Sequence, residues 1–236
     1  MKTQAIVPVA GSGARFQASL SVPQAIPKPL ILVNGKPLFV YTLEALHASS
    51  LIDSIILAVQ ETYLKEFAEI VRQYKLQKVS RIIPGGETRA DSVFRGLQLL
   101  DSHTKFVLIH DGVRPLVSTE LIDQAIKLVK QHPAVITAVP VKPTIKKVDV
   151  QNMLVQETLE RDTLWEVQTP QVFHKEVILR AHEQSGEGNR ATDDAVLVEK
   201  LGIPVKVLQG DYKNIKVTTQ DDLVFMETLL SLKEVK

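Results

Sequence analysis

The chain has 236 residues, and its 28 lysines and arginines nearly balance its 27 aspartates and glutamates, for a net charge of +1. A protein that binds a nucleic-acid backbone carries a basic surplus, so this balance argues against a nucleic-acid partner. Cysteine is absent, which excludes a disulfide scaffold and a thiolate nucleophile and suits a reducing compartment. No apolar run approaches the roughly eighteen residues of a membrane span, and no export signal is visible. We therefore expect a cytoplasmic protein with no membrane partner.

Short β-branched runs alternate with segments of helical period along the chain, which is the pattern of βαβ units around a parallel sheet. The predicted strands are residues 4–10, 54–59, 79–83, 106–110, 134–139 and, as the last core strand, 205–208. The predicted helices are residues 39–47, 63–74, 90–100, 119–131, 175–184, 193–201 and 220–232. Most of the strands are continuous apolar runs, as in strands covered on both faces. The sequence predicts an α/β fold.

One stretch departs from this alternation. Residues 141–173 have no helical period, and two short runs, 144–150 and 154–159, flank the turn at residues 151–153. This pattern indicates a protruding β-hairpin. Because an isolated hairpin is marginally stable in water, it has to pack on a second subunit or on its own domain, and the sequence favours neither.

The first predicted strand ends in a glycine turn, Ala10-Gly11-Ser12-Gly13-Ala14-Arg15. Ligands of open parallel sheets bind outside the carboxyl ends of the strands. Glycines there let backbone N–H groups approach a phosphate, and Arg15 brings a permanent cation. A plain βα turn explains the glycines equally well. Phe16 stands where the dinucleotide fingerprint needs a third glycine, which disfavours a nicotinamide-dependent dehydrogenase.

Two further segments carry cations. Lys28 lies between two prolines that restrict its backbone, so it is either a positioned phosphate ligand or a solvated loop lysine. The third predicted strand leads into Gly85-Gly86-Glu87-Thr88-Arg89-Ala90-Asp91-Ser92. A flat base could lie on these glycines, but capping of the next helix by Thr88 or Asp91 accounts for the segment equally well.

The fourth predicted strand ends in His110-Asp111-Gly112-Val113-Arg114-Pro115. A carboxylate at this place can hold Mg²⁺ or accept from a ribose hydroxyl, and Arg114 can neutralise a phosphate. The alternative is that Asp111 and Arg114 pair in a structural turn. We expect His110 to be a strand residue whose ring nitrogens are hydrogen-bonded within the protein. Cations gathered at one crevice would imply an anionic ligand.

Taken in order, these segments resemble the 2-C-methyl-D-erythritol 4-phosphate cytidylyltransferases of the non-mevalonate isoprenoid pathway, over nearly the whole chain. Further carriers of the resemblance are Gln168-Thr169-Pro170-Gln171, Ala191-Thr192-Asp193-Asp194 and Asn214-Ile215-Lys216-Val217-Thr218. The resemblance implies a Rossmann-like, mostly parallel sheet with helices on both faces and a protruding arm. It implies transfer of CMP from CTP to 2-C-methyl-D-erythritol 4-phosphate, with Mg²⁺, giving 4-diphosphocytidyl-2-C-methyl-D-erythritol and pyrophosphate. It also implies one nucleotidyltransferase domain over residues 1–236 and a homodimer joined through the arm at 141–173.

The resemblance assigns roles to individual residues. Arg15 and Lys28 would stabilise the transition state. The acceptor phosphate would be positioned by Lys216 and by Arg161, the latter reaching across from the other subunit's arm. The residues around CTP would be Val9, Ala10, Gly11, Gly13, Gly86, Glu87, Arg89, Ser92, Asp111 and Gly112, with Asp111 also near the metal. The acceptor pocket would be lined by Arg114, Thr144, Thr169 and Thr192. Gly112 stands where the family often has alanine, and the loop from Phe16 to Pro27 is longer than the compact family form.

The chemistry agrees with a site rich in cations. A phosphate monoester has a second pKa of about 6, so it is already an oxyanion nucleophile at neutral pH and requires no general base. The reaction requires orientation of two anions and neutralisation of charge at the α-phosphoryl group. Two alternatives remain at this stage: a ribitol-5-phosphate cytidylyltransferase with the same CTP motifs, and a noncatalytic CTP sensor, which would lack Arg15 and Lys28.

Overall fold

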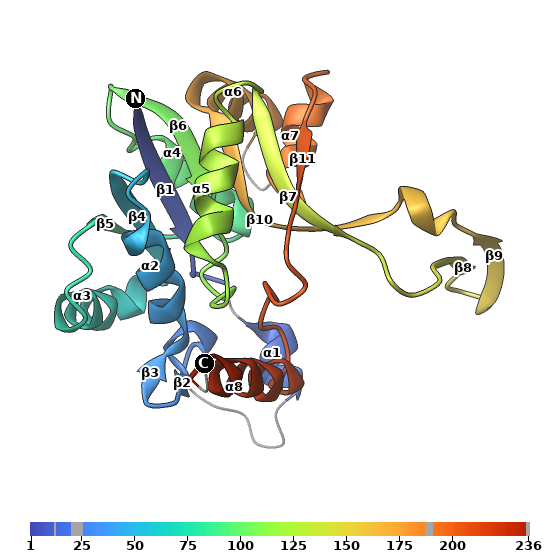
Figure 1. The fold of residues 1–236 in the computed structure, drawn as a ribbon, viewed down its shortest axis with the longest axis horizontal. Helices are drawn as coiled ribbons and strands as arrows, with labels where there is room; N and C mark the ends of the chain where they lie inside the picture. The colour runs from blue at the N-terminus through green and yellow to red at the C-terminus, as the bar shows by residue number, and fades with distance from the viewer. Residues whose placement is uncertain (12, 20–25, 187–190, 235–236) are drawn as a thin grey trace.

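A computed structural model describes the chain except for residues 12, 20–25, 187–190 and 235–236. Its centre is a seven-stranded sheet in the order β11-β7-β10-β6-β1-β4-β5 (Figure 1). The strands are β1 (Lys2–Pro8), β4 (Ser54–Val59), β5 (Val79–Pro84), β6 (Thr104–Ile109), β7 (Ala134–Pro140), β10 (Trp165–His174) and β11 (Lys206–Gln209). Only β10 is antiparallel to its neighbours. The predicted α/β, Rossmann-like fold is confirmed.

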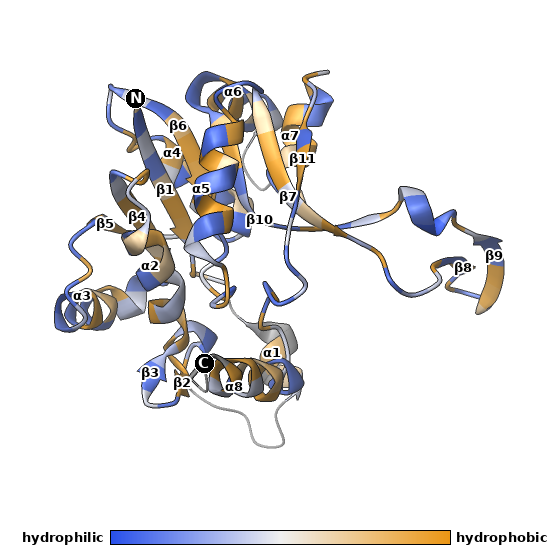
Figure 2. Ribbon diagram, in the orientation of Figure 1, coloured by the Kyte–Doolittle hydropathy of each residue, from blue (hydrophilic) through white to orange (hydrophobic). Residues whose placement is uncertain are grey.

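Helices cover both faces of the sheet. The helices are α1 (Ala14–Ser19), α2 (Leu38–Ala48), α3 (Leu64–Gln73), α4 (Arg89–Leu97), α5 (Thr119–Leu128), α6 (Lys175–Ser185), α7 (Ala195–Lys200) and α8 (Gln220–Glu234). One core layer joins the sheet to α2, α3 and α5, and the other joins it to α4, α6 and α7. Figure 2 shows the apolar residues of the central strands enclosed between these layers.

A third, smaller apolar cluster lies below the carboxyl ends of the strands. Phe16 of α1 and Met226 of α8 meet there with Val113, Val217 and Val33 of the short strand β2 (Leu32–Val33), which pairs with β3 (Lys36–Pro37). This cluster fixes the loops that carry Lys28 and Lys216. Lys28 itself begins the 3-10 helix η1 (Lys28–Leu30), and a second 3-10 helix, η2 (Glu61–Tyr63), precedes α3.

The seven predicted helices and six predicted strands all exist, with ends displaced by a few residues. The interpretation of the last strand was wrong in detail. Strand β11 is not a core strand but a sheet edge, and most of its residues are exposed. The other edge, β5, is exposed in part as well, because an edge strand is covered less completely than a central one.

The largest difference from the prediction is β10. Nearly all of its residues lie inside the stretch for which the sequence shows no helical period. Its residues 171–174 pair with β6 and residues 165–173 pair with β7, so the strand lies in the middle of the sheet. The protruding part is therefore residues 141–164, which we call the arm. It holds the hairpin of β8 (Lys146–Asp149) and β9 (Leu154–Thr158) and the 3-10 turn η3 (Arg161–Thr163).

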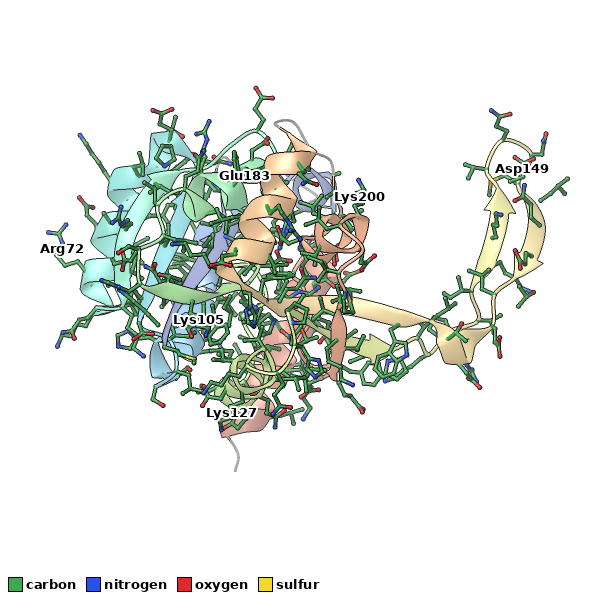
Figure 3. All side chains as sticks on the ribbon, turned by 90° about the horizontal axis from the view of Figure 1, so that it is seen from above. Arg72, Lys105, Lys127, Asp149, Glu183 and Lys200 are labelled. Carbon is green, nitrogen blue, oxygen red and sulfur yellow. The ribbon has the colours of Figure 1, made fainter. Side chains whose placement is uncertain are left out.

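The arm does not fold back on its own domain. Figure 3 shows Asp149 at its far end, well away from the sheet and its helices. Four apolar side chains at the tip are exposed: Val150, Met153, Leu154 and Val155, with 61–79% of their surface accessible. Among the described residues nothing covers them, so of the two alternatives that the sequence left open, packing on the arm's own domain is not seen.

Helix α8 begins with a reciprocal cap that the sequence pattern Thr-x-x-Asp predicts. The Asp222 carboxylate accepts from the N–H groups of Thr218 and Thr219 at 2.7 and 2.8 Å, and the Asp222 N–H donates to Thr219 Oγ1 at 3.4 Å. Burial would raise the pKa of Asp222, but these hydrogen bonds outweigh it and lower the pKa below its usual value.

We expect Asp222→Ala to lower the free energy of unfolding by about 1 kcal/mol at pH 7, as loss of a cap does. Because the pKa of Asp222 is depressed in the folded state, this contribution is present above the unfolded pKa of about 3.9 and is lost as pH falls through the folded pKa. Urea unfolding at pH 7 and below pH 4 measures it. Asp221→Ala, in the same exposed turn, is the control, and an equal loss there would contradict the capping role.

Candidate active site

Two cavities open at the carboxyl ends of the strands. The first, of about 400 Å³, is lined by the turn after β1, by Lys28 and by Ser92, and we call it the glycine-turn cavity. The second, of about 330 Å³, lies against β10 and the start of α7, and we call it the β10 cavity. Four residues line both cavities: Arg89, Asp111, Thr192 and Lys216. The two cavities are therefore the halves of one crevice.

Asp111 is the centre of the crevice. It follows β6, and its side chain is only 8% exposed. Its Oδ1 accepts from Nε of Arg89 at 2.7 Å, and its Oδ2 lies 2.8 Å from Nζ of Lys216 and 3.7 Å from Nε of Arg114. Three cations from three segments of the chain thus surround one carboxylate.

The pKa shifts follow from this arrangement. Burial would raise the pKa of Asp111, but Arg89, Lys216 and Arg114 outweigh burial and hold it well below its usual value. Burial would lower the pKa of Arg89, but the carboxylates of Asp194 and Asp111 raise it instead. For Arg114 burial prevails over the carboxylates, and its pKa is lowered. The carboxylate is ionised at neutral pH, and its charge is matched by these partners.

His110 has the satisfied ring that the sequence predicted. The Asp111 N–H donates to Oγ1 of Thr169 at 3.1 Å, and that hydroxyl lies 3.0 Å from Nδ1 of His110. The other ring nitrogen, Nε2, lies 3.3 Å from the carbonyl of Arg114. Because a carbonyl only accepts, Nε2 carries the proton and Nδ1 accepts from Thr169. Burial lowers the pKa of His110 to about 4, so the ring is neutral.

The turn before α4 forms the helix cap that was one of its two interpretations. Thr88 and Asp91 form a reciprocal capping box, as the structural reading predicted. At the same time the Ser92 hydroxyl accepts from the N–H of Gly86 at 3.0 Å and donates to the Thr88 carbonyl at 3.0 Å. A Cβ at Gly85 would lie 2.3 Å from Cβ of Ala10. The glycine pair therefore lies directly against the turn after β1.

The two lysines of the crevice are held by neighbouring parts of the chain. The ammonium of Lys28 donates to the carbonyl of Val217 at 2.7 Å, one residue after Lys216. The loop that carries Lys216 is held in turn by Arg114, which donates to the carbonyl of Asn214 at 2.8 Å. Lys28 and Lys216 thus stand at adjacent positions on the crevice wall.

Most of the predicted site residues come together here. Those that line the glycine-turn cavity are Val9, Gly11, Gly13, Lys28, Arg89, Ser92, Asp111, Thr192 and Lys216. Those that line the β10 cavity include Arg114, Thr169, Thr192 and Lys216. Ala10, Gly86, Glu87 and Gly112 belong to the same loops but are not among the lining residues. Arg15 lies in α1, but its side chain and the loop at 20–25 are outside what the structure describes.

Two predicted acceptor residues are not in the crevice of the same chain. Thr144 and Arg161 lie on the arm and are exposed, and neither lines a cavity. The Arg161 guanidinium donates to the carbonyl of Lys142 at 3.4 Å and lies 4.0 Å from Asp162. These two residues therefore do not contribute to the crevice of their own chain.

Sequence reasoning missed the residues that lie behind the crevice. Asp194 and His182 are 1% and 3% exposed and are bonded to one another and, through Asp194, to Arg89. Asp194 stood within a recognised segment, but no local pattern links it to a histidine of the preceding helix. Gln168 and Asn214 are likewise buried and bonded to each other at 3.3 Å.

A protein-family model described as "IspD: 2-C-methyl-D-erythritol 4-phosphate cytidylyltransferase" matches residues 3–232. The chain belongs to this family. Among its curated relatives, the 2-C-methyl-D-erythritol 4-phosphate cytidylyltransferase of Dictyoglomus thermophilum is 43% identical over 99% of this chain and 98% of its own. That of Geobacillus thermodenitrificans is 43% identical over 98% of both chains.

Solved structures of the family share the fold. The 4-diphosphocytidyl-2C-methyl-D-erythritol synthase of Anaerococcus prevotii superposes with a TM-score of 0.82 and 34% identity, over 98% of both chains. The predicted family is thus confirmed over nearly the whole chain. The protein is a cytidylyltransferase of isoprenoid biosynthesis, and the match is to the erythritol enzymes rather than to a ribitol enzyme or a noncatalytic sensor.

Gly112 and Val9 fit together beneath the glycine-turn cavity of this cytidylyltransferase. A Cβ at Gly112 would lie 2.1 Å from Cγ1 of Val9, which lines the cavity. We expect Gly112→Ala alone to cost about 1–3 kcal/mol of stability through overpacking and to weaken CTP binding.

In Val9→Ala/Gly112→Ala the clash with Val9 is removed and only Val7 Cγ1, at 3.1 Å, stays close to the extra methyl group, so both properties should recover in part. A double-mutant cycle on urea unfolding and on the KM for CTP measures this coupling. Additive effects of the two substitutions would show that the contact with Val9 is not what excludes a side chain at Gly112.

Proposed function

We propose that this crevice transfers CMP from CTP to 2-C-methyl-D-erythritol 4-phosphate, with CTP in the glycine-turn cavity and the acceptor in the β10 cavity. One observation carries the proposal that a single crevice holds both substrates. The cavities meet at Arg89, Asp111, Thr192 and Lys216, and a phosphoryl transfer needs its two anionic substrates to meet at one cationic junction.

In the proposed reaction, an oxygen of the acceptor phosphate attacks the α-phosphorus of CTP. A P–O bond forms to the acceptor while the bond to the β-phosphate breaks, and pyrophosphate leaves with the electron pair. The attacking oxygen is already ionised at neutral pH, so the reaction needs no protein base. This agrees with a site in which His110 is buried, neutral and fully hydrogen-bonded.

The catalytic contribution of the chain is then electrostatic. Lys28 and Arg15 would neutralise charge that develops at the α-phosphoryl group and on the leaving pyrophosphate. Lys216, Arg114, Thr169 and Thr192 would orient the acceptor, and the neighbouring positions of Lys28 and Lys216 support this division. Because Lys216, Lys28 and Arg114 are held by Asp111, Val217 and Asn214 in turn, these three cations need little reorganisation when charge builds up.

We propose Mg²⁺ as the cofactor, with Asp111 as its protein ligand. The described residues hold no group of three or more acidic, histidine or cysteine side chains placed to bind a metal ion by themselves. Mg²⁺ commonly binds through one or two carboxylates together with substrate phosphates and water, so one ionised carboxylate facing both cavities fits it. When bound, the metal would neutralise phosphate charge at the transferring group.

We further propose a homodimer in which the arm brings Arg161 and Thr144 to the crevice of the second subunit. The exposed apolar tip and the absence of both residues from their own crevice support this arrangement. In this proposal residues 1–236 form one domain, and the arm within 141–173 joins the subunits. The enzyme would act in the cytoplasm, since a chain without cysteine suits a reducing compartment. No helix among the described residues could cross a membrane.

The proposed substrates are tested by measuring pyrophosphate release from CTP and Mg²⁺ with each of two acceptors. We expect turnover with 2-C-methyl-D-erythritol 4-phosphate at least about 100-fold above that with ribitol 5-phosphate, since an acceptor pocket that orients one substrate misplaces the other. Lys28→Ala is the control that ties the signal to this crevice. A preference for ribitol 5-phosphate would reassign the acceptor pocket, and no release with either acceptor would contradict the transfer.

The shared site is tested by mixing subunits. Arg161→Ala and Lys28→Ala should each be nearly inactive, but a mixed dimer has one crevice with Lys28 from one subunit and Arg161 from the other. Random mixing in equal amounts should recover roughly a quarter of the wild-type rate, since half of the dimers are mixed and one of their two sites is intact. Activity no higher than that of the separate variants would contradict a cross-subunit arginine.

A further inference from the structure

Behind the crevice lies a buried carboxylate that none of the roles above uses. Asp194 precedes α7 and is 1% exposed. Its Oδ2 accepts from Nη1 of Arg89 at 2.7 Å, and its Oδ1 lies 3.1 Å from Nε2 of His182. Its own N–H donates to Oε1 of Gln171 at 3.2 Å. Asp194 is therefore fixed from α4, α6 and β10 at once.

The guanidinium of Arg89 is the group that this arrangement orients. Its Nε donates to Asp111 and its Nη1 donates to Asp194, both at 2.7 Å. Its third nitrogen, Nη2, is buried and has no hydrogen-bond partner among the described residues. Because the guanidinium is planar and rigid, two carboxylates in fixed positions determine where Nη2 points. Arg89 lines both cavities, so its charged side chain lies at their junction.

His182 in turn restrains Asp194. Its ring is 3% exposed and stacks on Phe94 of α4 with ring centroids 6.0 Å apart and an angle of 2° between the planes. The ring cannot rotate freely in this position, so Nε2 stays directed at the carboxylate. The chain of contacts runs from His182 through Asp194 and Arg89 to Asp111.

Cohesion between the helices does not explain this cluster well. When apolar residues of similar size replace a buried ion pair, the free energy of unfolding often stays the same or increases. What an ion pair supplies and an apolar contact does not is a fixed direction for a charged donor. The direction supplied here is that of Arg89 at the junction of the two cavities.

We propose that Asp194 and His182 are positioning residues for cytidylyl transfer. They hold the positive charge of Arg89 in a fixed place at the junction, where it attracts a phosphoryl group, while its Nε keeps Asp111 in place. This inference rests on the proposed function for the identity of the ligand, but the orientation of Arg89 does not depend on turnover.

The first test removes the negative charge of the Asp194 side chain and keeps the shape of that side chain. Asp194→Asn should lower kcat about 10–100-fold, the range found when a group that orients a site residue is lost. Both KM values should change less than kcat, because a misdirected donor affects the transition state most. Asp123→Asn removes a carboxylate that bonds Ser49 between α2 and α5, far from the crevice, and should leave kcat within about twofold of wild type.

The second test observes Arg89 directly. In protein labelled with ¹⁵N at arginine, the Nε–H signal assigned by its loss in Arg89→Lys should exchange slowly with water in wild type and should shift when CTP is added. In Asp194→Asn it should exchange at least about tenfold faster, because one of its two anchors is weakened. An unchanged signal and an unchanged kcat in a folded Asp194→Asn would overturn the proposal.

A pair of variants at His182 keeps the proposal testable if Asp194→Asn does not fold. His182→Phe keeps a flat ring against Phe94 but removes the donor, whereas His182→Gln keeps a nitrogen donor. We expect faster exchange of the Arg89 signal and a lower kcat in His182→Phe, with recovery in His182→Gln. Equal behaviour of the two would overturn the role of His182. If wild type transfers no CMP, the proposed function fails, while the exchange measurement still decides whether Asp194 and His182 orient Arg89.

Discussion

The arrangement of the crevice depends on the charge of Asp111, buried at the carboxyl end of β6. A carboxylate removed from water costs several kcal/mol unless it is paired and hydrogen-bonded. Two of its partners come from segments distant in sequence, since Arg89 begins α4 and Lys216 lies in the loop before α8, while Arg114 lies three residues later in the same turn after β6. Pairing with Asp111 therefore joins these three segments, and their meeting place is the junction of the two cavities.

The same pairing explains how a chain with a net charge of +1 presents a cationic crevice. Cations brought together without a counter-ion would repel one another. Asp111 and Asp194 offset part of that repulsion, so Arg89, Arg114 and Lys216 can stand together before any substrate is bound. Anionic substrates then meet a site that is already assembled, which is the condition for electrostatic stabilisation at low cost in reorganisation.

How far the sequence predicts this site depends on whether each residue belongs to a local pattern. The turn after β1 and the Asp111 turn were predictable, because parallel strands place their carboxyl ends on one edge of the sheet. Strand β10 was not, because Gln168 and Gln171 interrupt its apolar run. Those side chains are buried through bonds to Asn214 and Asp193, which are distant in sequence.

His182 was hidden for a similar reason. It stands in the last turn of α6, where a histidine commonly lies at the surface near the helix end. Its burial follows from Asp194, twelve residues later, and from Phe94 of a different helix. The direction of the arm was equally unreadable, since β8 and β9 pair only with each other and no local feature fixes where a hairpin points.

The structure itself supplies what fixes the base of the arm. β7 and β10 run into the arm as a pair that reaches Pro140 and Trp165. The Tyr212 hydroxyl donates to the carbonyl of Pro140 at 2.7 Å, and the Lys142 ammonium lies 3.6 Å from the centroid of the Tyr212 ring. Tyr212 belongs to the loop whose Lys216 bonds Asp111.

One loop thus contacts both the base of the arm and the centre of the crevice. The base of the arm therefore has a defined position relative to the crevice of its own chain. In a two-fold dimer the symmetry axis relates the two subunits. An arm base that is fixed relative to its own crevice is then also fixed relative to the crevice of the second subunit. A rigid arm base is what would allow a residue as exposed as Arg161 to reach a defined place in a second subunit.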